Sequence, residues 1–436
     1  MIEAPPSHEL VRMVHGLTGP ELREWVRQQD PSALGAVLEV DDPRYQVVDL
    51  YGPLGKARRE APVHATTQIA LAGFEDFRSI SSHTEREKAC VLGFDVAKDV
   101  LTRPETFSSR IREETIGPVW GHTILGMDGE EHRRHRGLIS KAFSHRAIQQ
   151  WEEELIIPVV QGLLDRIEGE ESFELISTYT VAFPVHVITA MLGLPPDQMP
   201  RFNRWATETI TIFFDVERGL AASRALNDYL APIIEERREN PGDNDLITLL
   251  TQAQVEGERL STQAIVDFLR LLLPAGAETT YRSSSSTLVG LLTNADQLDA
   301  VKRDSALIPQ AVEEGIRWEP PLSSVERLAE VDTELCGVPI KADTIVEVGV
   351  GAANRDEAHW ANGDEFDLFR EPLPHLSFAW GSHLCMGAHL ARLETTVAFA
   401  HLLARFPGLH LDPNRDADPV IRGIGFRSPD KIPVRA

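Results

Sequence analysis

A single cysteine, Cys385, lies within the ten-residue stretch FAWGSHLCMG, which runs from Phe378 to Gly387 and is rich in small residues. An apolar pattern typical of a helix begins directly after this stretch. A cysteine at the N-terminus of a helix meets the positive end of the helix dipole and free backbone N–H groups, which both stabilise a thiolate. Because a thiolate is a metal ligand or a nucleophile, this setting predicts a chemical role for Cys385.

Three interpretations of Cys385 compete. The first is a buried core cysteine, which is common in proteins. The second is zinc, held by His383, Cys385 and His389, although a structural zinc takes four ligands and no second ligand pair is evident. The third is a single axial thiolate to haem iron, which needs small neighbours and cations for the two propionates. The local pattern favours haem over the other two.

Charge and cysteine content narrow the class of protein. The chain has 43 Lys and Arg against 67 Asp and Glu, and its net charge of −24 argues for a soluble chain and against nucleic acid as a partner. The N-terminus does not resemble a secretory signal, and no stretch approaches the ~20 apolar residues of a membrane span. Cys90, Cys336 and Cys385 are odd in number and far apart, which predicts a reducing cytoplasm and no disulfide framework.

Hydrophobic periodicity predicts one large, mainly α domain with small β sheets, spanning residues 1–436. Beyond a polar start with one amphipathic piece at 22–26, the expected segments follow in chain order. They are short β-like runs at 47–91, helices at 95–268, strands at 331–350, a loop at 351–375, and a last helix at 386–405 followed by short strands.

The cysteine stretch resembles the haem-ligand loop of cytochrome P450 enzymes, whose pattern is Phe-x-x-Gly-x-(His/Arg)-x-Cys-x-Gly. The matching residues are Phe378, Gly381, His383, Cys385 and Gly387. Ala379 stands where glycine is usual, and Met386 stands where leucine is frequent. The resemblance implies that Cys385 is the axial ligand of haem b, with Phe378 and Gly387 beside the cofactor.

A second motif supports the resemblance. Glu314 and Arg317 lie three residues apart, so a helix would place them on one face. Read without context, such a pair is usually a solvated surface ion pair. In the family, a Glu-x-x-Arg pair and a later arginine, here Arg370, form a buried triad that fixes the cysteine loop. The resemblance implies a structural role for these three residues.

The run LLLPAGAETT, at 271–280, matches the family's distal signature within a long helical pattern. Pro274 removes a backbone hydrogen bond, so we expect a kink. Without context, the run reads equally well as a helix with a small-residue packing face. The resemblance implies that Ala275 and Gly276 leave room at the cofactor. It also implies that Glu278 and Thr279 relay protons to iron-bound dioxygen.

A cationic stretch at 132–143 opens a further helical pattern. By resemblance the haem propionates are bound by His132, Arg136, Arg327 and His383. The remaining cations of the stretch, Arg133, Arg134 and Lys141, suit docking of an acidic ferredoxin or flavodoxin, although they read equally well as solvated charges. The run Gly349 to Asn354 lacks the third glycine of a dinucleotide loop, so we expect no bound flavin or NAD(P).

The resemblance implies the family's α-rich triangular prism and a bacterial-type monooxygenase that uses O2, a ferredoxin or flavodoxin, and an NAD(P)H-dependent reductase. It implies hydroxylation of a small to medium hydrophobic substrate. The expected pocket residues are Ile116, Trp120, Leu322, Val325 and Ile424. Two alternatives remain open: a peroxide-using haem-thiolate enzyme and a non-enzymatic haem sensor or ligand-binding protein. Both leave the Glu278–Thr279 pair without a purpose.

Overall fold

The computed structural model describes residues 17–29, 46–74, 85–194, 198–213, 215–242 and 245–436. The chain divides into two compact units that interleave along the sequence. Unit 1 comprises Met1–Glu39, Arg112–Gly169 and Ser177–Glu278, and unit 2 comprises Val40–Ile111, Glu170–Ile176 and Thr279–Ala436. The prediction of a single domain over residues 1–436 stays a prediction.

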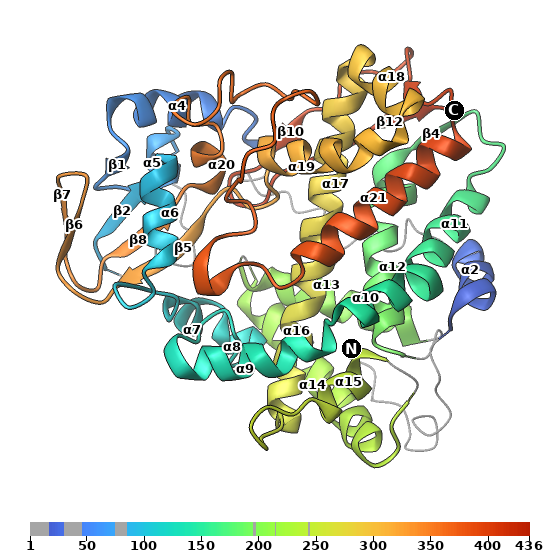
Figure 1. Ribbon diagram of the computed structural model, residues 1–436, viewed down its shortest axis with the longest axis horizontal. Helices are drawn as coiled ribbons and strands as arrows, with labels where there is room; N and C mark the ends of the chain where they lie inside the picture. Colours follow the sequence, from blue (N-terminus) through green and yellow to red (C-terminus); the bar gives the residue numbers. More distant parts are fainter. Residues whose placement is uncertain (1–16, 30–45, 75–84, 195–197, 214, 243–244) are drawn as a thin grey trace. The chain divides into compact units, whose positions relative to one another are not determined.

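Unit 1 is helical, as the periodicity of residues 95–268 predicts (Figure 1). Its helices, including one at its edge, are α2 (Gly19–Gln28), α7 (Ile111–Thr115), α8 (Gly117–Trp120), α9 (Gly129–Ala142), α10 (His145–Trp151), α11 (Ile157–Arg166), α12 (Ala182–Met191), α13 (Met199–Thr209), α14 (Val216–Glu239), α15 (Leu246–Gln252) and α16 (Thr262–Leu273). In the part of the chain that the structure describes, none is long and apolar enough to cross a membrane.

The packing of α2 on α11 shows how the apolar faces of unit 1 are used. Leu22 and Val26 of α2 are fully buried, which confirms the predicted amphipathic piece. Gly162 of α11 permits the close approach, because a Cβ there would lie 2.5 Å from the Arg23 carbonyl oxygen. The other residues before position 46 that the sequence marks as polar lie mainly outside the described residues.

The distal run changes its helical geometry at the predicted place. Helix α16 ends at Leu273, and a wider π-type turn covers Pro274–Glu278 before α17 (Thr279–Thr293) begins. Proline lacks the N–H that would continue the ordinary hydrogen bonding, and such wide turns are frequent at functional sites. Within the turn, Gly276 packs against α12, where a Cβ would lie 2.3 Å from Ile188 Cδ1.

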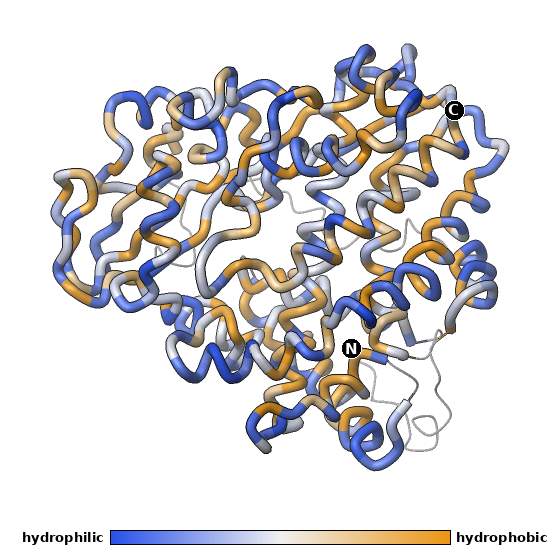
Figure 2. Tube along the Cα trace, in the orientation of Figure 1, coloured by the Kyte–Doolittle hydropathy of each residue, from blue (hydrophilic) through white to orange (hydrophobic). Residues whose placement is uncertain are grey.

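Unit 2 is built around a sheet that, among the described residues, has five strands in the order β1-β2-β8-β5-β3. They are β1 (Val63–His64), β2 (Lys88–Val91), β8 (Ile345–Val348), β5 (Val325–Ala329) and β3 (Phe107–Ser108). Only the β2–β8 pair is parallel among these described strands. Their apolar residues are coloured orange in Figure 2.

Successive side chains along a strand point to opposite faces of the sheet, and both faces of this sheet are covered. Ala89 and Val91 pack in one buried cluster with the apolar side of α6 (Phe94–Thr102). Cys90 packs in another buried cluster with Leu50 and with residues of α4 (Tyr51–Glu60). The sheet therefore lies between two layers of helix within unit 2.

The remaining helices of unit 2 are α5 (Gln68–Leu71), α18 (Ala295–Arg303), α19 (Ile308–Trp318), α20 (Val350–Ala353) and α21 (Ala388–Arg405). Helices α17 and α19 approach closely at Gly315, where a Cβ would lie 1.9 Å from Thr287 Oγ1. Helix α21 confirms the helix predicted at 386–405 and begins two residues later than predicted.

Smaller sheets of two or three strands complete the described part of unit 2. They are β6 (Thr333–Leu335) with β7 (Val338–Ile340), β10 (Ile421–Arg422) with β11 (Ser428–Pro429), and β4 (Ser172–Glu174) with β12 (Pro433–Arg435) and β9 (His410–Leu411). The strands predicted at 331–350 and after residue 405 are confirmed. The loop predicted at 351–375 is confirmed apart from the end of α20.

The β-like reading of residues 47–91 is wrong for two segments. Tyr51–Glu60 forms α4, although two glycines and a proline in YGPLGKARRE mask its helical period. Gln68–Leu71 forms α5, which begins where the Thr67 hydroxyl accepts a hydrogen bond from the Ala70 amide. At α4 the tertiary packing of Leu54 and Ala57 outweighs local propensity, and at α5 the Thr67 cap does so.

Candidate active site

The cysteine loop is closed on itself by backbone hydrogen bonds. A 3-10 turn at Gly381–His383 precedes Cys385, and α21 begins three residues after it. The Cys385 amide donates to the Phe378 carbonyl oxygen at 2.8 Å. This bond holds Cys385, an exposed residue, at the start of α21, where the helix dipole favours a thiolate.

The zinc interpretation of this loop is wrong. Among the described residues, no group of three or more His, Cys, Asp or Glu side chains is arranged to hold a metal ion. His389 is on α21, one turn after Cys385, and does not complete a ligand set. The donor set at the loop is therefore a single sulfur, which fits the axial position of haem iron and not a tetrahedral metal site.

Two residues of the loop have left-handed backbone conformations. Gly381 has φ +71°, and a Cβ on it would lie 2.8 Å from the Leu101 carbonyl oxygen at the end of α6. Ala379 has φ +58°, a conformation that costs free energy for alanine but not for glycine. Beside them, the Lys98 ammonium of α6 lies 4.4 Å from the ring centre of Trp380. The loop is thus seated on α6.

Replacing Ala379 with glycine is expected to stabilise the protein by up to about 1 kcal/mol, because the left-handed conformation no longer strains a Cβ. The free energy of unfolding, measured with urea, checks this expectation. The matched control is Ala391→Gly within α21, which should destabilise by about 0.5–1 kcal/mol. Equal destabilisation by both changes would contradict the expectation.

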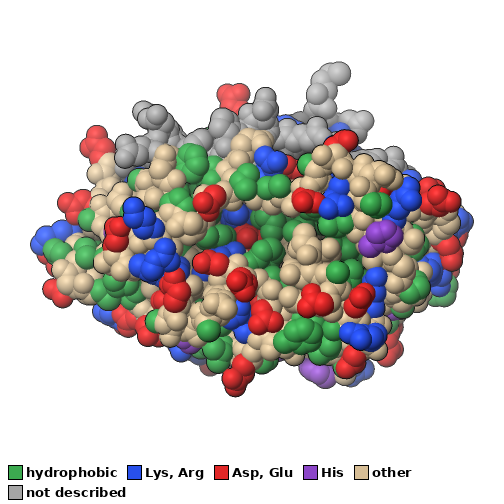
Figure 3. Space-filling view, turned by 90° about the horizontal axis from the view of Figure 1, so that it is seen from above, with side chains coloured by type: hydrophobic (Ala, Val, Ile, Leu, Met, Phe, Trp, Pro, Cys, Tyr) green, Lys and Arg blue, Asp and Glu red, His purple; other side chains and the backbone are tan. Residues whose placement is uncertain are grey.

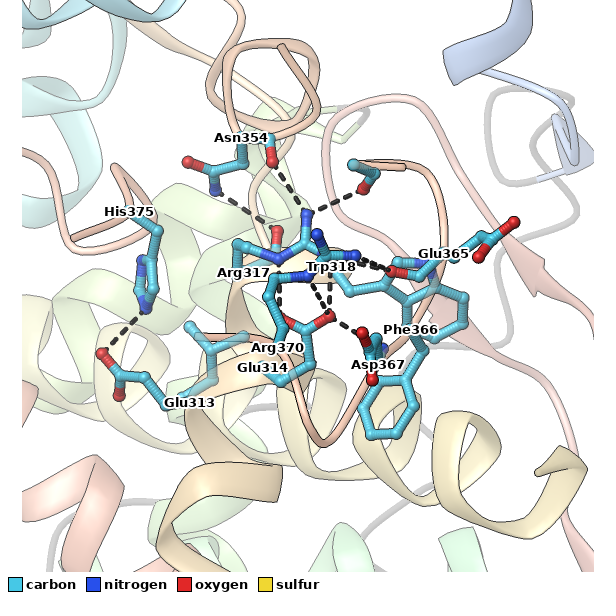
Figure 4. A network of polar contacts seen from close by, with 12 residues as sticks. Glu313, Glu314, Arg317, Trp318, Asn354, Glu365, Phe366, Asp367, Arg370 and His375 are labelled. Atoms are coloured by element: carbon cyan, nitrogen blue, oxygen red, sulfur yellow. Dashed lines mark hydrogen bonds and ion pairs between the residues drawn. The ribbon is translucent and has the colours of Figure 1, made fainter. Parts of the chain in front are cut away.

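The predicted triad is formed, with Glu314 and Arg317 buried and Arg370 half-buried (Figure 4). Glu314 of α19 pairs with Arg317 through two hydrogen bonds, at 2.7 and 2.8 Å, and with Arg370 Nε at 3.3 Å. The Arg317 guanidinium also donates to three backbone carbonyls, those of Asn354, Gly363 and Glu365, at 2.8–2.9 Å. The triad therefore connects α19 to the irregular chain that leads to the cysteine loop.

A second buried ionic group lies close in sequence to the triad. Glu319 pairs with Arg355 at 3.1 Å and with Arg427. The Tyr51 ring lies beside both guanidinium groups, 3.6 Å from Arg355 and 4.9 Å from Arg427. This group joins α4, the Ala353–Asp356 run and the chain near residue 427 inside unit 2.

The predicted proton-relay residues, Glu278 and Thr279, lie where the π-type turn ends. Glu278 is buried and is the last residue of unit 1, whereas Thr279 is half-buried and begins α17 in unit 2. Ala275 is exposed and Gly276 is half-buried. The next residue, Thr280, is buried and donates from its hydroxyl to Glu394 Oε1 at 3.0 Å.

Glu394 is a functional candidate that the sequence does not reveal. It lies on α21, is 2 % exposed, and its Oε2 has no hydrogen-bond partner among the described residues. Burial raises the pKa of this carboxyl to about 8, against the opposing hydrogen bond from Thr280. A glutamate within the sequence LARLETTV carries no local signal of such burial.

The predicted propionate ligands are divided between the units. His132 and Arg136 lie one turn apart on α9 in unit 1, and His132 is buried. In unit 2, Arg327 is buried on β5 and donates to the Glu326 carbonyl oxygen at 2.9 Å, while His383 is half-buried in the 3-10 turn. His132 and Arg136 thus share one helix of unit 1, whereas Arg327 and His383 lie on different elements of unit 2.

The surface cations of α9 are partly neutralised. Arg133 pairs with Glu130, Arg134 pairs with Glu258 at 3.1 Å, and Lys141 donates to the Gln254 carbonyl at 2.7 Å. The hydrophilic first half of α9 is coloured blue in Figure 2. On the face in Figure 3, acidic and basic side chains are interspersed, which agrees with an acidic chain.

The predicted pocket residues also lie in separate units. In unit 1, Ile116 and Trp120 are buried and joined by a backbone hydrogen bond of 2.9 Å across α8. Gly117 and Pro118 begin this short helix. A buried polar network holds it: the Ser223 hydroxyl donates to the Val119 carbonyl at 2.5 Å.

In unit 2, the remaining pocket residues are brought together. Leu322 and Val325 are half-buried, and Leu322 pairs with Phe426 in an isolated β-bridge. Between them, Ser323 donates to the carbonyl of Ile424, whose side chain is buried in the cluster with Leu50. Ser323 therefore ties two segments of chain together.

Comparisons with known proteins agree with the motifs. The sequence pattern of the family described as cytochrome P450 matches residues 201–431. The putative cytochrome P450 YjiB of Bacillus subtilis (strain 168) is 34 % identical over 75 % of this chain and 84 % of its own length. Nocardicin C N-oxygenase of Nocardia uniformis subsp. tsuyamanensis is 35 % identical over 72 % and 79 % of the two chains.

Solved structures agree in fold as well. The crystal structure of CYP109E1 from Bacillus megaterium in complex with testosterone matches with a TM-score of 0.78 at 29 % identity. The match covers 89 % of this chain and 99 % of that one. Motifs, sequence relatives and fold point the same way: the chain belongs to the cytochrome P450 family and is a haem b-dependent haem-thiolate monooxygenase of the bacterial type.

Proposed function

We propose that this monooxygenase hydroxylates a C–H bond of a small to medium hydrophobic substrate, with Cys385 as the axial ligand of haem. The observation that carries the assignment is the closed cysteine loop, in which the Cys385 amide is bonded to Phe378 at the start of α21. Bound haem supplies O2 activation, and electron donation from an axial thiolate favours cleavage of the O–O bond.

The chain's own residues would bind the cofactor and manage protons. We assign His132, Arg136, Arg327 and His383 to the two propionates, in support of which His132 and Arg327 are buried cation positions. The Glu278 carboxylate would pass protons inward, and the Thr279 hydroxyl would hold a water molecule at Oγ1. The wide turn at Pro274–Glu278 supports this assignment, because it interrupts the helix at the relay.

We assign the substrate pocket to Ile116, Trp120, Leu322, Val325 and Ile424, which are all apolar. The printed titles of two matched structures are consistent with an apolar ligand. One names testosterone bound to CYP109E1, and another names hexadec-9Z-enoic acid on an acyl carrier protein bound to P450BioI. Ile424 would contribute chiefly by shaping the turn on which it lies, because its side chain is packed in a core cluster.

Electrons would come from a separate ferredoxin or flavodoxin and an NAD(P)H-dependent reductase. The exposed cations Arg133, Arg134 and Lys141 of α9 are the docking residues that we assign, despite their partial neutralisation. A cytoplasmic location stays a prediction that rests on the odd number and wide spacing of the cysteines.

The test is the absorption spectrum of the haem-loaded, dithionite-reduced protein under carbon monoxide. We expect the strongly red-shifted Soret band of a thiolate ligand, absent in Cys385→Ala. The second measurement supplies NADPH, ferredoxin, ferredoxin reductase and testosterone as probe substrate. We expect the unmodified protein to form more product per O2 consumed than the Thr279→Ala variant. A band typical of histidine ligation in the unmodified protein would overturn the assignment of Cys385.

A further inference from the structure

Two adjacent glutamates on α19 serve different networks. Glu314 belongs to the buried triad with Arg317 and Arg370. Glu313 points elsewhere and contacts His375, as Figure 4 shows, and also contacts Arg392. Neither the sequence motifs nor the triad accounts for Glu313.

The contacts of Glu313 are strong ones. Its two carboxylate oxygens accept from Arg392 Nε and Nη2, each at 2.7 Å, which is the two-pronged geometry of the strongest arginine–carboxylate pairs. His375 Nε2 lies 3.1 Å from Glu313 Oε1, and the His375 side chain is only 2 % exposed. The Arg392 and His375 hydrogen bonds outweigh burial and lower the pKa of Glu313 to about 2, so its carboxylate stays ionised at neutral pH.

The state of the His375 ring is fixed by its backbone neighbour. The Ser377 amide donates to His375 Nδ1 at 3.2 Å, so Nδ1 is the accepting nitrogen. The ring proton therefore sits on Nε2 and faces the Glu313 carboxylate. The Ser377 amide thus fixes the orientation of the ring, with Nε2 towards Glu313.

Both partners of Glu313 also contact Phe378, the first residue of the cysteine loop. The Arg392 guanidinium lies over the Phe378 ring, 4.3 Å from its centre. The His375 ring centre lies 5.8 Å from that of Phe378. The carbonyl of the same Phe378 accepts the Cys385 amide hydrogen.

The two residues between His375 and Phe378 are anchored as well. The Leu376 amide donates to Asn354 Oδ1 at 2.8 Å. The Ser377 hydroxyl donates to the Ile316 carbonyl of α19 at 2.7 Å. Leu376 and Ser377 are thus held by hydrogen bonds. The Phe378 side chain is held by its ring contacts with His375 and Arg392, the two partners of Glu313.

We propose that Glu313, His375 and Arg392 form a positioning cluster that holds Phe378, and through its carbonyl the Cys385 amide, in the geometry that retains a thiolate ligand. The cluster is separate from the triad, since it contacts the loop itself and the triad contacts only the chain before it. The proposal rests on the assignment of Cys385 to haem. The three residues act through Phe378 and are therefore positioning residues.

The test follows the thiolate-type carbon monoxide band of the reduced, haem-loaded enzyme as it decays at elevated temperature. Arg392→Met removes the charge and the stacking cation, Arg392→Lys keeps the charge without the two-pronged pairing, and Glu313→Gln keeps the shape. The control is Arg110→Met, which breaks an equally half-exposed pair with Glu330 in unit 2. Backbone unfolding is followed in parallel by circular dichroism.

We expect the thiolate band of Arg392→Met and Glu313→Gln to decay about tenfold faster than that of the unmodified enzyme, which corresponds to the loss of one charge-assisted hydrogen bond. The decay rate of Arg392→Lys should lie between the rates of these two variants and that of the unmodified enzyme. The decay rate of Arg110→Met should equal that of the unmodified enzyme. Band decay should precede backbone unfolding in the cluster variants only.

Decay at the unmodified rate in both Glu313→Gln and Arg392→Met would overturn the cluster. So would band loss that merely coincides with backbone unfolding, because a purely structural role predicts that outcome. A failure of Cys385 as ligand is recognised separately, since the unmodified enzyme would then show no thiolate band at all.

Discussion

Replacing Glu314 with glutamine is expected to lower the free energy of unfolding by about 3–5 kcal/mol, the usual result of removing one partner of a buried ion pair. Glutamine keeps the shape of the side chain and removes the charge that compensates Arg317, whose side chain is 3 % exposed. Burial already lowers the pKa of Arg317, and the hydrogen bond that Arg317 donates to Glu314 is the main opposing effect. The Asp367 amide, which donates to Glu314 Oε1 at 2.9 Å, keeps an acceptor in the variant.

The double variant Glu314→Leu, Arg317→Met separates this triad from an ordinary buried ion pair. Well-packed apolar residues often replace a buried pair at no cost. Here the Arg317 guanidinium also serves the carbonyls of Asn354, Gly363 and Glu365, which methionine would leave unsatisfied. We therefore expect the double variant to be no more stable than Glu314→Gln.

Urea unfolding of the haem-loaded protein, followed by circular dichroism, measures both changes. The half-exposed pair Arg110–Glu330 provides the control, and Glu330→Gln should cost less than about 1 kcal/mol. Recovery of stability in the double variant would show that the carbonyl contacts are dispensable.

Replacing Glu394 with glutamine is expected to remove a stability loss that the unmodified protein suffers as the pH rises. The folded-state pKa of this carboxyl is about 8, against an ordinary value of 4.5, because burial disfavours the charged form. Between these two values the unfolded chain has released the proton while the folded chain retains it. Stability therefore falls with increasing pH across this window, by on the order of 5 kcal/mol in total.

Glutamine cannot titrate, and its amide oxygen can accept the hydrogen bond from the Thr280 hydroxyl. Below about pH 5 the variant and the unmodified protein should have similar free energies of unfolding. The variant should then become progressively more stable than the unmodified protein up to pH 8.

Urea midpoints at pH 5, 6, 7 and 8 give the measurement. Glu334→Gln, at an exposed position on β6, is the control and should leave the pH dependence unchanged. Parallel pH profiles for Glu394→Gln and the unmodified protein would mean that Glu394 ionises normally in the folded state.

The motif-bearing elements could be predicted from the sequence because their signals are local. The helix after Cys385, the strands near residue 340 and the ion pair of Glu314 with Arg317 all follow from spacing within a few residues. The contact with Arg370 needed the family resemblance, since 53 residues separate it from Arg317.

Residues whose environment comes from distant chain could not be predicted. Glu394 and Glu313 read as ordinary surface glutamates of amphipathic helices, and only tertiary packing buries one and pairs the other with His375. Helix α4 was missed for a related reason, because burial of Leu54 and its neighbours stabilises a segment of poor intrinsic helix propensity. The sequence also gives no indication that Ser323 bonds to the Ile424 turn.

The three-stranded sheet of unit 2 has a consequence for how the protein is made. Strand β4, at Ser172–Glu174, pairs with β12 at Pro433–Arg435, so more than half of the chain separates the two partners. On the ribosome, β4 emerges long before β12 is synthesised, so β4 remains unpaired with β12 while the intervening chain is made. Completion of this sheet therefore waits until residues 433–435 have been synthesised. A chain whose synthesis stops short of residue 433 would leave that strand edge open to pairing with other chains.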